Sequence, residues 1–260
     1  MTRASKTLPL AEAARIWNLY GFNAPEEMVL EDLAMAMNIF VVDARLDSAA
    51  ARLVRKGDYG LIRVSDQLRY SGHRRFAIAH EIGHFQLHKK VSQLLACTDA
   101  DMQASYQSSP YEIEASIFAG ALLMPTEVFR ERVGRQVPKA TVIKNLAQQF
   151  DTSLTATALR YVETSKDYVA FVVSEKGRIL WWRVSESFGN HNLWLESGNA
   201  IPRYSAAAAY FHDGKTSDGP IEVDLRDWLG EMPGIVAGYV YEQAIPLPQF
   251  DQVISIIWLP

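Results

Sequence analysis

The chain has 260 residues, of which 48% are hydrophobic and 22% charged, and its formal net charge is −4. This composition is typical of a globular protein with one large or two modest domains. The acidic balance gives no general attraction to nucleic acid or to an anionic membrane. A single cysteine, Cys97, excludes an internal disulfide and fits a reducing compartment. The N-terminus lacks the apolar core of a signal peptide, and no apolar run is long enough to span a bilayer, so we expect a cytoplasmic protein.

The first quarter of the chain shows both helical and strand patterns. Gly21 ends the first helical pattern, and Pro25 with two acids opens the second. Alternating residues on both sides of Gly57 indicate a β-hairpin. The expected elements are helices over residues 10–20 and 25–37, a short buried strand over 39–42, and hairpin strands over 51–55 and 61–64.

Residues 74–88 read RRFAIAHEIGHFQLH and contain the strongest chemical signal in the chain. Residues four apart on an α-helix lie on one face, so His80 and His84 can direct two imidazoles at one ion. Glu81, next to the first histidine, can take a proton from a water molecule there. Apolar neighbours such as Phe76 and Ile82 allow the helix to be buried, which holds the ligands still. The pattern favours a metal site over two structural histidines.

A catalytic zinc of this kind takes three protein ligands. After a polar segment at residues 97–110, which predicts an exposed loop, residues 111–124 form an apolar helical pattern with two acids at its start. Ser116 lies one turn after Glu112 and can hydrogen-bond behind the site. Glu114 projects close to the apolar stripe. We therefore expect Glu112 to be the third ligand and Glu114 to be a surface or capping acid.

Two further helical patterns follow, over residues 141–150 and 155–162, separated by a short polar turn. This arrangement is compatible with a helix-turn-helix DNA reader. Its basic residues, Lys139, Lys144 and Arg160, are too few to favour DNA contact. A helical pair that packs against the metal-binding domain is the preferred interpretation.

The composition changes near Ser165, where short β-branched and aromatic runs begin. Five of the six tryptophans lie beyond this point, and such clusters form a core more often than they line a small-molecule pocket. The expected strands are residues 168–174, 179–184, 193–196, 221–223, 235–242 and 253–258, with one small helix at 206–211. The tryptophans are Trp181, Trp182, Trp194, Trp228 and Trp258.

RRFAIAHEIGHFQLH followed by EIEASIFAGALLMP resembles the ImmA/IrrE family of metallopeptidases. The family pattern is Arg-Arg-Phe before His-Glu-hydrophobic-Gly-His, then Glu-x-x-Ala-Asn/Asp-x-Phe-Ala and Leu-Leu-Met-Pro. The resemblance implies a minimal thermolysin-like, gluzincin-type zinc peptidase with His80, His84 and Glu112 as ligands and Glu81 as general base. Manganese suits the same ligands. The sequence departs from the pattern at Ser116, where Asn or Asp is usual and reaches further toward a neighbouring histidine.

The resemblance also implies a biological role. Such peptidases cleave a helix-turn-helix repressor and so switch on mobile-element or DNA-damage genes. Some radiation-response members carry a helix-turn-helix-like segment followed by a GAF-like sensor domain. We therefore expect an α+β chain with a metallopeptidase domain over residues 1–132, a helix-turn-helix-like segment over 133–165 and a β-rich sensor domain over 166–260. The alternative is a regulator that binds DNA, repressor or a small ligand and uses its peptidase-like domain structurally.

Two parts of the expected active site stay open. A donor should stabilise the oxyanion formed from the peptide carbonyl. Tyr111, His73 and His88 are the candidates, although a surface Tyr or His needs no function. An extended substrate is expected to add as a further strand to the second hairpin strand if that strand has a free edge. The strand residues concerned are Leu61, Ile62, Arg63 and Val64.

Overall fold

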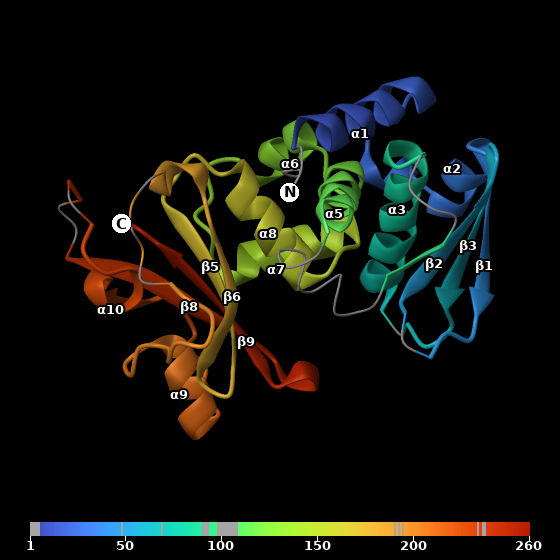
Figure 1. Ribbon diagram of the computed structural model, residues 1–260. Coiled ribbons are helices and arrows are strands. Elements are labelled where there is room, and N and C mark those ends of the chain that lie inside the picture. Colours follow the sequence, from blue (N-terminus) through green and yellow to red (C-terminus); the bar gives the residue numbers. More distant parts are fainter. Residues whose placement is uncertain are drawn as a thin grey trace. The chain divides into compact units, whose positions relative to one another are not determined.

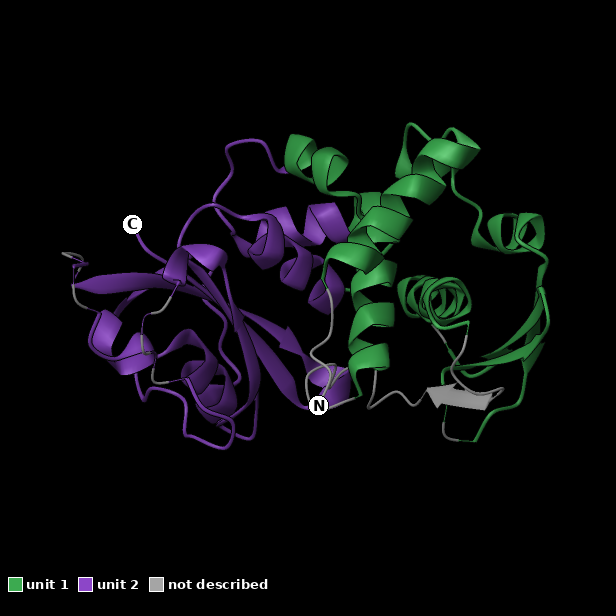
Figure 2. Cartoon of the chain, turned by 45° about the horizontal axis from the view of Figure 1, so that its top comes forward, with its two compact units in different colours: residues 1–132, 148–153 green, residues 133–147, 154–260 purple. Residues whose placement is uncertain are grey.

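The computed structural model describes residues 6–47, 49–68, 70–89, 94–97, 109–189, 191, 193, 195–232, 234–235 and 238–260. The chain forms two compact units, one from residues 1–132 and 148–153 and the other from residues 133–147 and 154–260 (Figure 2). Each unit combines helices with a β-sheet, which confirms the expected α+β class. None of the helices in the described part of the chain is both long and apolar enough to cross a bilayer.

The sheet of the first unit has the strand order β1-β3-β2-β4, and Figure 1 labels the first three of these strands. β2 (Ala51–Lys56) and β3 (Tyr59–Ser65) form the expected antiparallel hairpin. β1 (Ile39–Ala44) pairs in parallel with the other side of β3, so β3 has a hydrogen-bonded neighbour on each side. The prediction of a free edge for substrate is therefore wrong for Leu61, Ile62, Arg63 and Val64.

The two edges of this sheet also differ from expectation. Ile39 of β1 is buried, but Phe40 and Val42 are 57% and 42% exposed, because these two residues share the face opposite Ile39. The expectation of a fully buried strand is thus wrong. β4 (Leu94–Cys97) pairs with β2 at the other edge and was missed, since Cys97 was expected in a loop. Residues 98–108 of that expected loop lie outside the described residues.

The first helix is confirmed and the second is interrupted. α1 (Thr7–Tyr20) ends at Gly21 with a left-handed φ of 68°. The segment expected as one helix from Pro25 is instead a 3₁₀ turn, η1 (Pro25–Glu27), followed by α2 (Leu30–Ala36). Met28 and Val29 between them are extended, and Met28 is 2% exposed. The extended segment between the two helices thus places the Met28 side chain in the core.

α3 (Ser71–Leu87) packs between the sheet and α5 (Pro110–Leu123). On the sheet side, Arg55 donates to the carbonyl of Phe85 at 2.6 Å near the end of α3, with its guanidinium 4.1 Å from the Phe85 ring centre. On the other side, α1 holds α5 through a buried hydrogen bond of 2.8 Å from the indole of Trp17 to the carbonyl of Leu122. α3 is therefore fixed from both sides.

The two helices expected over residues 141–150 and 155–162 are present as α7 (Ala140–Phe150) and α8 (Leu154–Thr164), and α6 (Thr126–Val133) precedes them. The turn between α7 and α8 belongs to the first unit and contacts the start of α3. The Ser71 hydroxyl donates to Asp151 at 2.5 Å. A Cβ on Gly72 would lie 2.8 Å from the carbonyl carbon of Thr152, so this approach requires glycine.

The second unit has an antiparallel sheet with the strand order β6-β5-β9-β8-β7. Most expected strands are confirmed, with shifted ends. Of the strand expected at residues 193–196, residue 194 lies outside the described residues and the others form no strand. The chain turns at Ser197-Gly198, which hydrogen-bond to Leu180 and Ile179 of β6. The strands are β5 (Val169–Glu175), β6 (Arg178–Val184), β7 (Ile221–Asp224), β8 (Tyr239–Leu247) and β9 (Gln252–Trp258).

Helices cover both faces of this sheet within the second unit (Figure 1). α8 packs on β5 and β6, whereas α9 (Ala206–Asp213) and the unexpected α10 (Leu225–Leu229) cover the other face. The described tryptophans are divided between the faces: Trp228, a residue of α10, lies in the core, and Trp258 contacts Tyr241 at a ring distance of 5.7 Å. These described tryptophans therefore do not form one cluster, and Trp194 lies outside the described residues.

Glu242 is a fully buried carboxylate that joins several elements of the second unit. It accepts hydrogen bonds from the Trp228 indole at 2.9 Å, the Ser255 hydroxyl at 2.7 Å and the backbone amides of Ala206 and Ala207. These donors belong to α10, β9 and α9, so one side chain fixes two helices on the sheet.

Candidate metal centre

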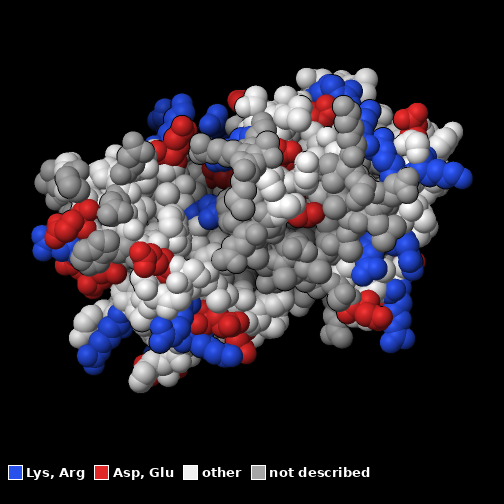
Figure 3. Space-filling view, viewed as in Figure 1, with Lys and Arg blue, Asp and Glu red and all other residues white. Residues whose placement is uncertain are grey.

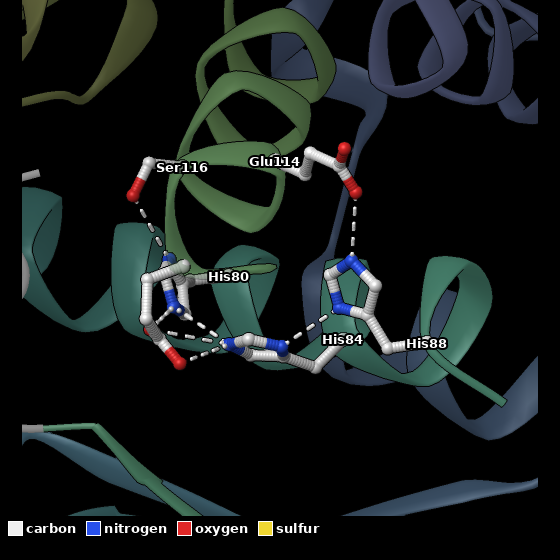
Figure 4. A network of polar contacts seen from close by, with 6 residues as sticks. His80, His84, His88, Glu114 and Ser116 are labelled. Atoms are coloured by element: carbon white, nitrogen blue, oxygen red, sulfur yellow. Dashed lines mark hydrogen bonds and ion pairs between the residues drawn. The ribbon is translucent and has the colours of Figure 1, made fainter. Parts of the chain in front are cut away.

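α3 carries both histidines of the motif on one face (Figure 4). His80 and His84 are each 1% exposed, and their Nε2 atoms lie 3.1 Å apart. Glu81 is completely buried beside them. The burial follows from packing on two sides, between the sheet and α5, which places the polar motif inside the unit.

α5 supplies the third group. Oε2 of Glu112 lies 3.0 Å from Nε2 of His80 and 3.3 Å from Nε2 of His84. One ligand atom from each of the three residues lies within 4.8 Å of the others. Two imidazole nitrogens and a carboxylate oxygen are the donor set that zinc takes in thermolysin-like catalytic sites, so the residues fit a divalent ion.

Burial opposes the ionisation of Glu112, but the hydrogen bonds from His80 and His84 together outweigh it. They hold the pKa of the Glu112 carboxyl below its ordinary value of 4.5. Glu112 is therefore a carboxylate at neutral pH, which is the form that binds a cation. The geometry therefore favours Glu112 over Glu114 as the third candidate ligand.

A second set of polar contacts lies on the other side of His84. Nδ1 of His84 is 3.0 Å from Nδ1 of His88, and Nε2 of His88 is 3.2 Å from Oε2 of Glu114 (Figure 4). Burial lowers the pKa of His88 below 6.5, against the opposing effect of Glu114. Tyr111 contacts the His88 ring edge-on at 5.0 Å. Glu114, expected as a surface or capping acid, is 14% exposed and faces His88.

The remaining candidates are placed as follows. The Ser116 hydroxyl is 3.4 Å from Nδ1 of His80, at the limit of a hydrogen bond. Tyr111 is 42% exposed. His73 lies in the first turn of α3, with its ring 5.7 Å from that of Tyr70. Sequence reasoning missed the contact of Glu114 with His88, although the four-residue spacing of His84 and His88 was a usable signal.

Comparison with known proteins agrees with this geometry. Residues 34–161 match the peptidase family model described as IrrE N-terminal-like domain. No curated protein matches the chain. Among solved structures, a Mycobacterium tuberculosis transcriptional regulator is similar, with a TM-score of 0.60 and 16% sequence identity. The similarity covers 97% of this chain and 76% of that one, and at this identity it shows the fold alone. Residues 34–161 thus form a metallopeptidase-type domain of the ImmA/IrrE family.

Proposed function

We propose that this protein is a metal-dependent, site-specific endopeptidase that cleaves a helix-turn-helix transcriptional repressor in the cytoplasm. Cleavage of the repressor would derepress stress-response or mobile-element genes. The observation that carries the proposal is the convergence of His80, His84 and Glu112 on one point, with Glu81 buried next to His80. A protein that acted only by binding would need no buried acid beside that donor set.

The chain's own residues suit peptide hydrolysis. His80, His84 and Glu112 would hold a zinc ion, with manganese as the other candidate. When bound, such an ion lowers the pKa of water and polarises a carbonyl group. Glu81 takes the proton from the attacking water and passes it to the amine, so the hydroxyl joins the carbonyl carbon as the C–N bond breaks. Burial of Glu81 and both histidines keeps other water away from this proton transfer.

We assign the other parts of the chain by their position after this domain. Residues 133–165 are the proposed helix-turn-helix-like segment, and residues 166–260 are the proposed GAF-like sensor domain for a small ligand. The mixed surface in Figure 3, where acidic and basic side chains are interspersed on the visible face, supports a protein substrate over DNA.

The test compares wild type with Glu81→Gln and Glu112→Ala, each co-expressed with candidate helix-turn-helix repressors from the same genome. Glu81→Gln should keep about one metal ion per chain and lose cleavage by a factor of roughly 10²–10⁴, because it removes the proton acceptor and leaves the ligands intact. Glu112→Ala should lose the metal as well.

A binding regulator is the second candidate, because the similar solved structure is named a transcriptional regulator. It predicts that wild type and Glu81→Gln have the same effect on repressor levels. Equal repressor levels with wild type and with Glu81→Gln would therefore refute the peptidase function and favour regulation by binding.

A further inference from the structure

We propose that His88 and Glu114 form a positioning relay that fixes the tautomer and orientation of His84. This inference rests on the proposed function, since it assigns His84 to a metal. The relay runs from Nδ1 of His84 to Nδ1 of His88 at 3.0 Å and from Nε2 of His88 to Oε2 of Glu114 at 3.2 Å. His84, His88 and Glu114 have side chains that are 0%, 3% and 14% exposed, so water competes little for these contacts.

The position of the protons follows from the geometry. His84 faces His80 and Glu112 with Nε2, so a metal there takes the Nε2 lone pair. The ring proton of His84 is then on Nδ1, which lies 3.0 Å from Nδ1 of His88. Nδ1 of His88 must accept, which places the proton of His88 on Nε2, facing the carboxylate of Glu114. The three groups therefore have one consistent arrangement of donors and acceptors.

The fold supplies both ends of this chain of contacts from the same two helices. His84 and His88 are four residues apart at the end of α3, and Glu112 and Glu114 are two residues apart at the start of α5. Glu112 contacts the Nε2 side of His84, whereas Glu114 acts on its Nδ1 side through His88. α5 thus holds the imidazole of His84 from both sides.

His80, the other candidate ligand, has a weaker hydrogen-bond partner behind its ring. Nδ1 of His80 has the Ser116 hydroxyl at 3.4 Å, against 3.0 Å from His84 to His88. Partners behind a ligand histidine orient the ring and raise its basicity, and a carboxylate does so more strongly than a hydroxyl. The relay is consequently a stronger orienting contact for His84 than Ser116 is for His80.

The first test is the zinc dissociation constant of the full-length protein, measured by chelator competition. Glu114→Ala and His88→Ala should each weaken zinc binding by about 10- to 100-fold. Glu114→Gln keeps an acceptor for His88, and His88→Gln can still accept from His84 and donate to Glu114, so each should lose less than its alanine counterpart. Ser116→Ala should lose less than either alanine variant.

His212→Gln is the matched control. His212 forms a similar pair with Asp213, at 2.5 Å, but it is exposed on α9 in the second unit. The zinc affinity of the His212→Gln variant should equal that of wild type. If Glu114→Ala and His88→Ala are folded and bind zinc as tightly as this control, the relay is refuted.

The second test needs no variant. Nitrogen chemical shifts of the imidazoles in zinc-loaded wild type should show His84 protonated at Nδ1 and His88 protonated at Nε2 only. A proton on Nδ1 of His88 would overturn the relay even if every variant failed to fold.

Cleavage at saturating zinc separates the two proposals. Zinc affinities that follow the expected order in a protein that cuts no repressor would refute the peptidase and leave the relay standing. Normal cleavage with unchanged zinc affinities would refute the relay alone.

Discussion

Gly83 lies in the contact between α3 and α5, one residue before the candidate ligand His84. A Cβ atom at this position would be 2.9 Å from Cδ1 of Phe118 and 3.3 Å from Cα and the carbonyl oxygen of Ala115. Phe118 and Ala115 are both fully buried, so neither can move into solvent. Gly83→Ala should therefore push α5 away from α3.

Two opposing effects set the magnitude. Alanine in place of glycine inside a helix stabilises by about 0.5–1 kcal/mol. Overpacking a close-packed core costs about 1–3 kcal/mol. Because one contact is with the backbone of α5, we take the upper half of this range and expect a net loss of about 1–2.5 kcal/mol. Zinc affinity should fall too, since α5 carries Glu112.

Gly120→Ala on α5 is the matched control, because no atom of the described residues, apart from its chain neighbours and the nearby backbone of α5, lies within 4 Å of its added Cβ. This variant should be more stable than wild type by about 0.5–1 kcal/mol. Amide hydrogen exchange in α3 and α5 measures both changes locally, and chelator competition measures zinc binding. The reasoning is refuted if Gly83→Ala protects the two helices as well as Gly120→Ala does and binds zinc like wild type.

Two predictions concern other parts of the chain. Burial raises the pKa of Glu242 above 4.5 despite its hydrogen bonds, so the unfolded chain loses this proton first as pH rises. Stability of the second unit should fall from pH 4.5 up to the raised pKa and stay level above it. Glu242→Gln should remove that slope in urea unfolding followed across this range; an unchanged slope would contradict the assignment. Arg55→Met should cost the first unit about 1–2 kcal/mol, because it removes the hydrogen bond to Phe85 and the cation–π contact. A loss below about 0.5 kcal/mol in hydrogen exchange of α3 would show that these contacts are not stabilising.

Local sequence patterns were sufficient for the elements that carry the candidate site. The motif helix α3 and the helix α5 were predicted with ends shifted by a few residues, because both have helical apolar spacing and clear stop signals. The hairpin of β2 and β3 followed from alternation around Gly57. The choice of Glu112 was also possible from sequence, since its spacing from Ser116 and the family pattern agreed. That choice is consistent with the distances from Glu112 to both histidines.

Features that depend on partners distant in sequence could not be predicted in this way. The apolar run of β1 suggested a buried strand, but its place at the sheet edge is decided by its parallel pairing with β3. The same pairing removed the free edge from Leu61 and its neighbours. β4 was missed because a four-residue strand gains its hydrogen bonds only from β2.

The sequence by itself determined which helices carry the candidate metal ligands, because a helical face depends only on local spacing along the chain. The tertiary structure decided what surrounds that face. His88 and Glu114 are 26 residues apart and meet only because α3 packs on α5. The spacing of residues within each helix does not encode how α3 packs on α5. That packing depends on close contacts such as the one between Gly83 and Ala115.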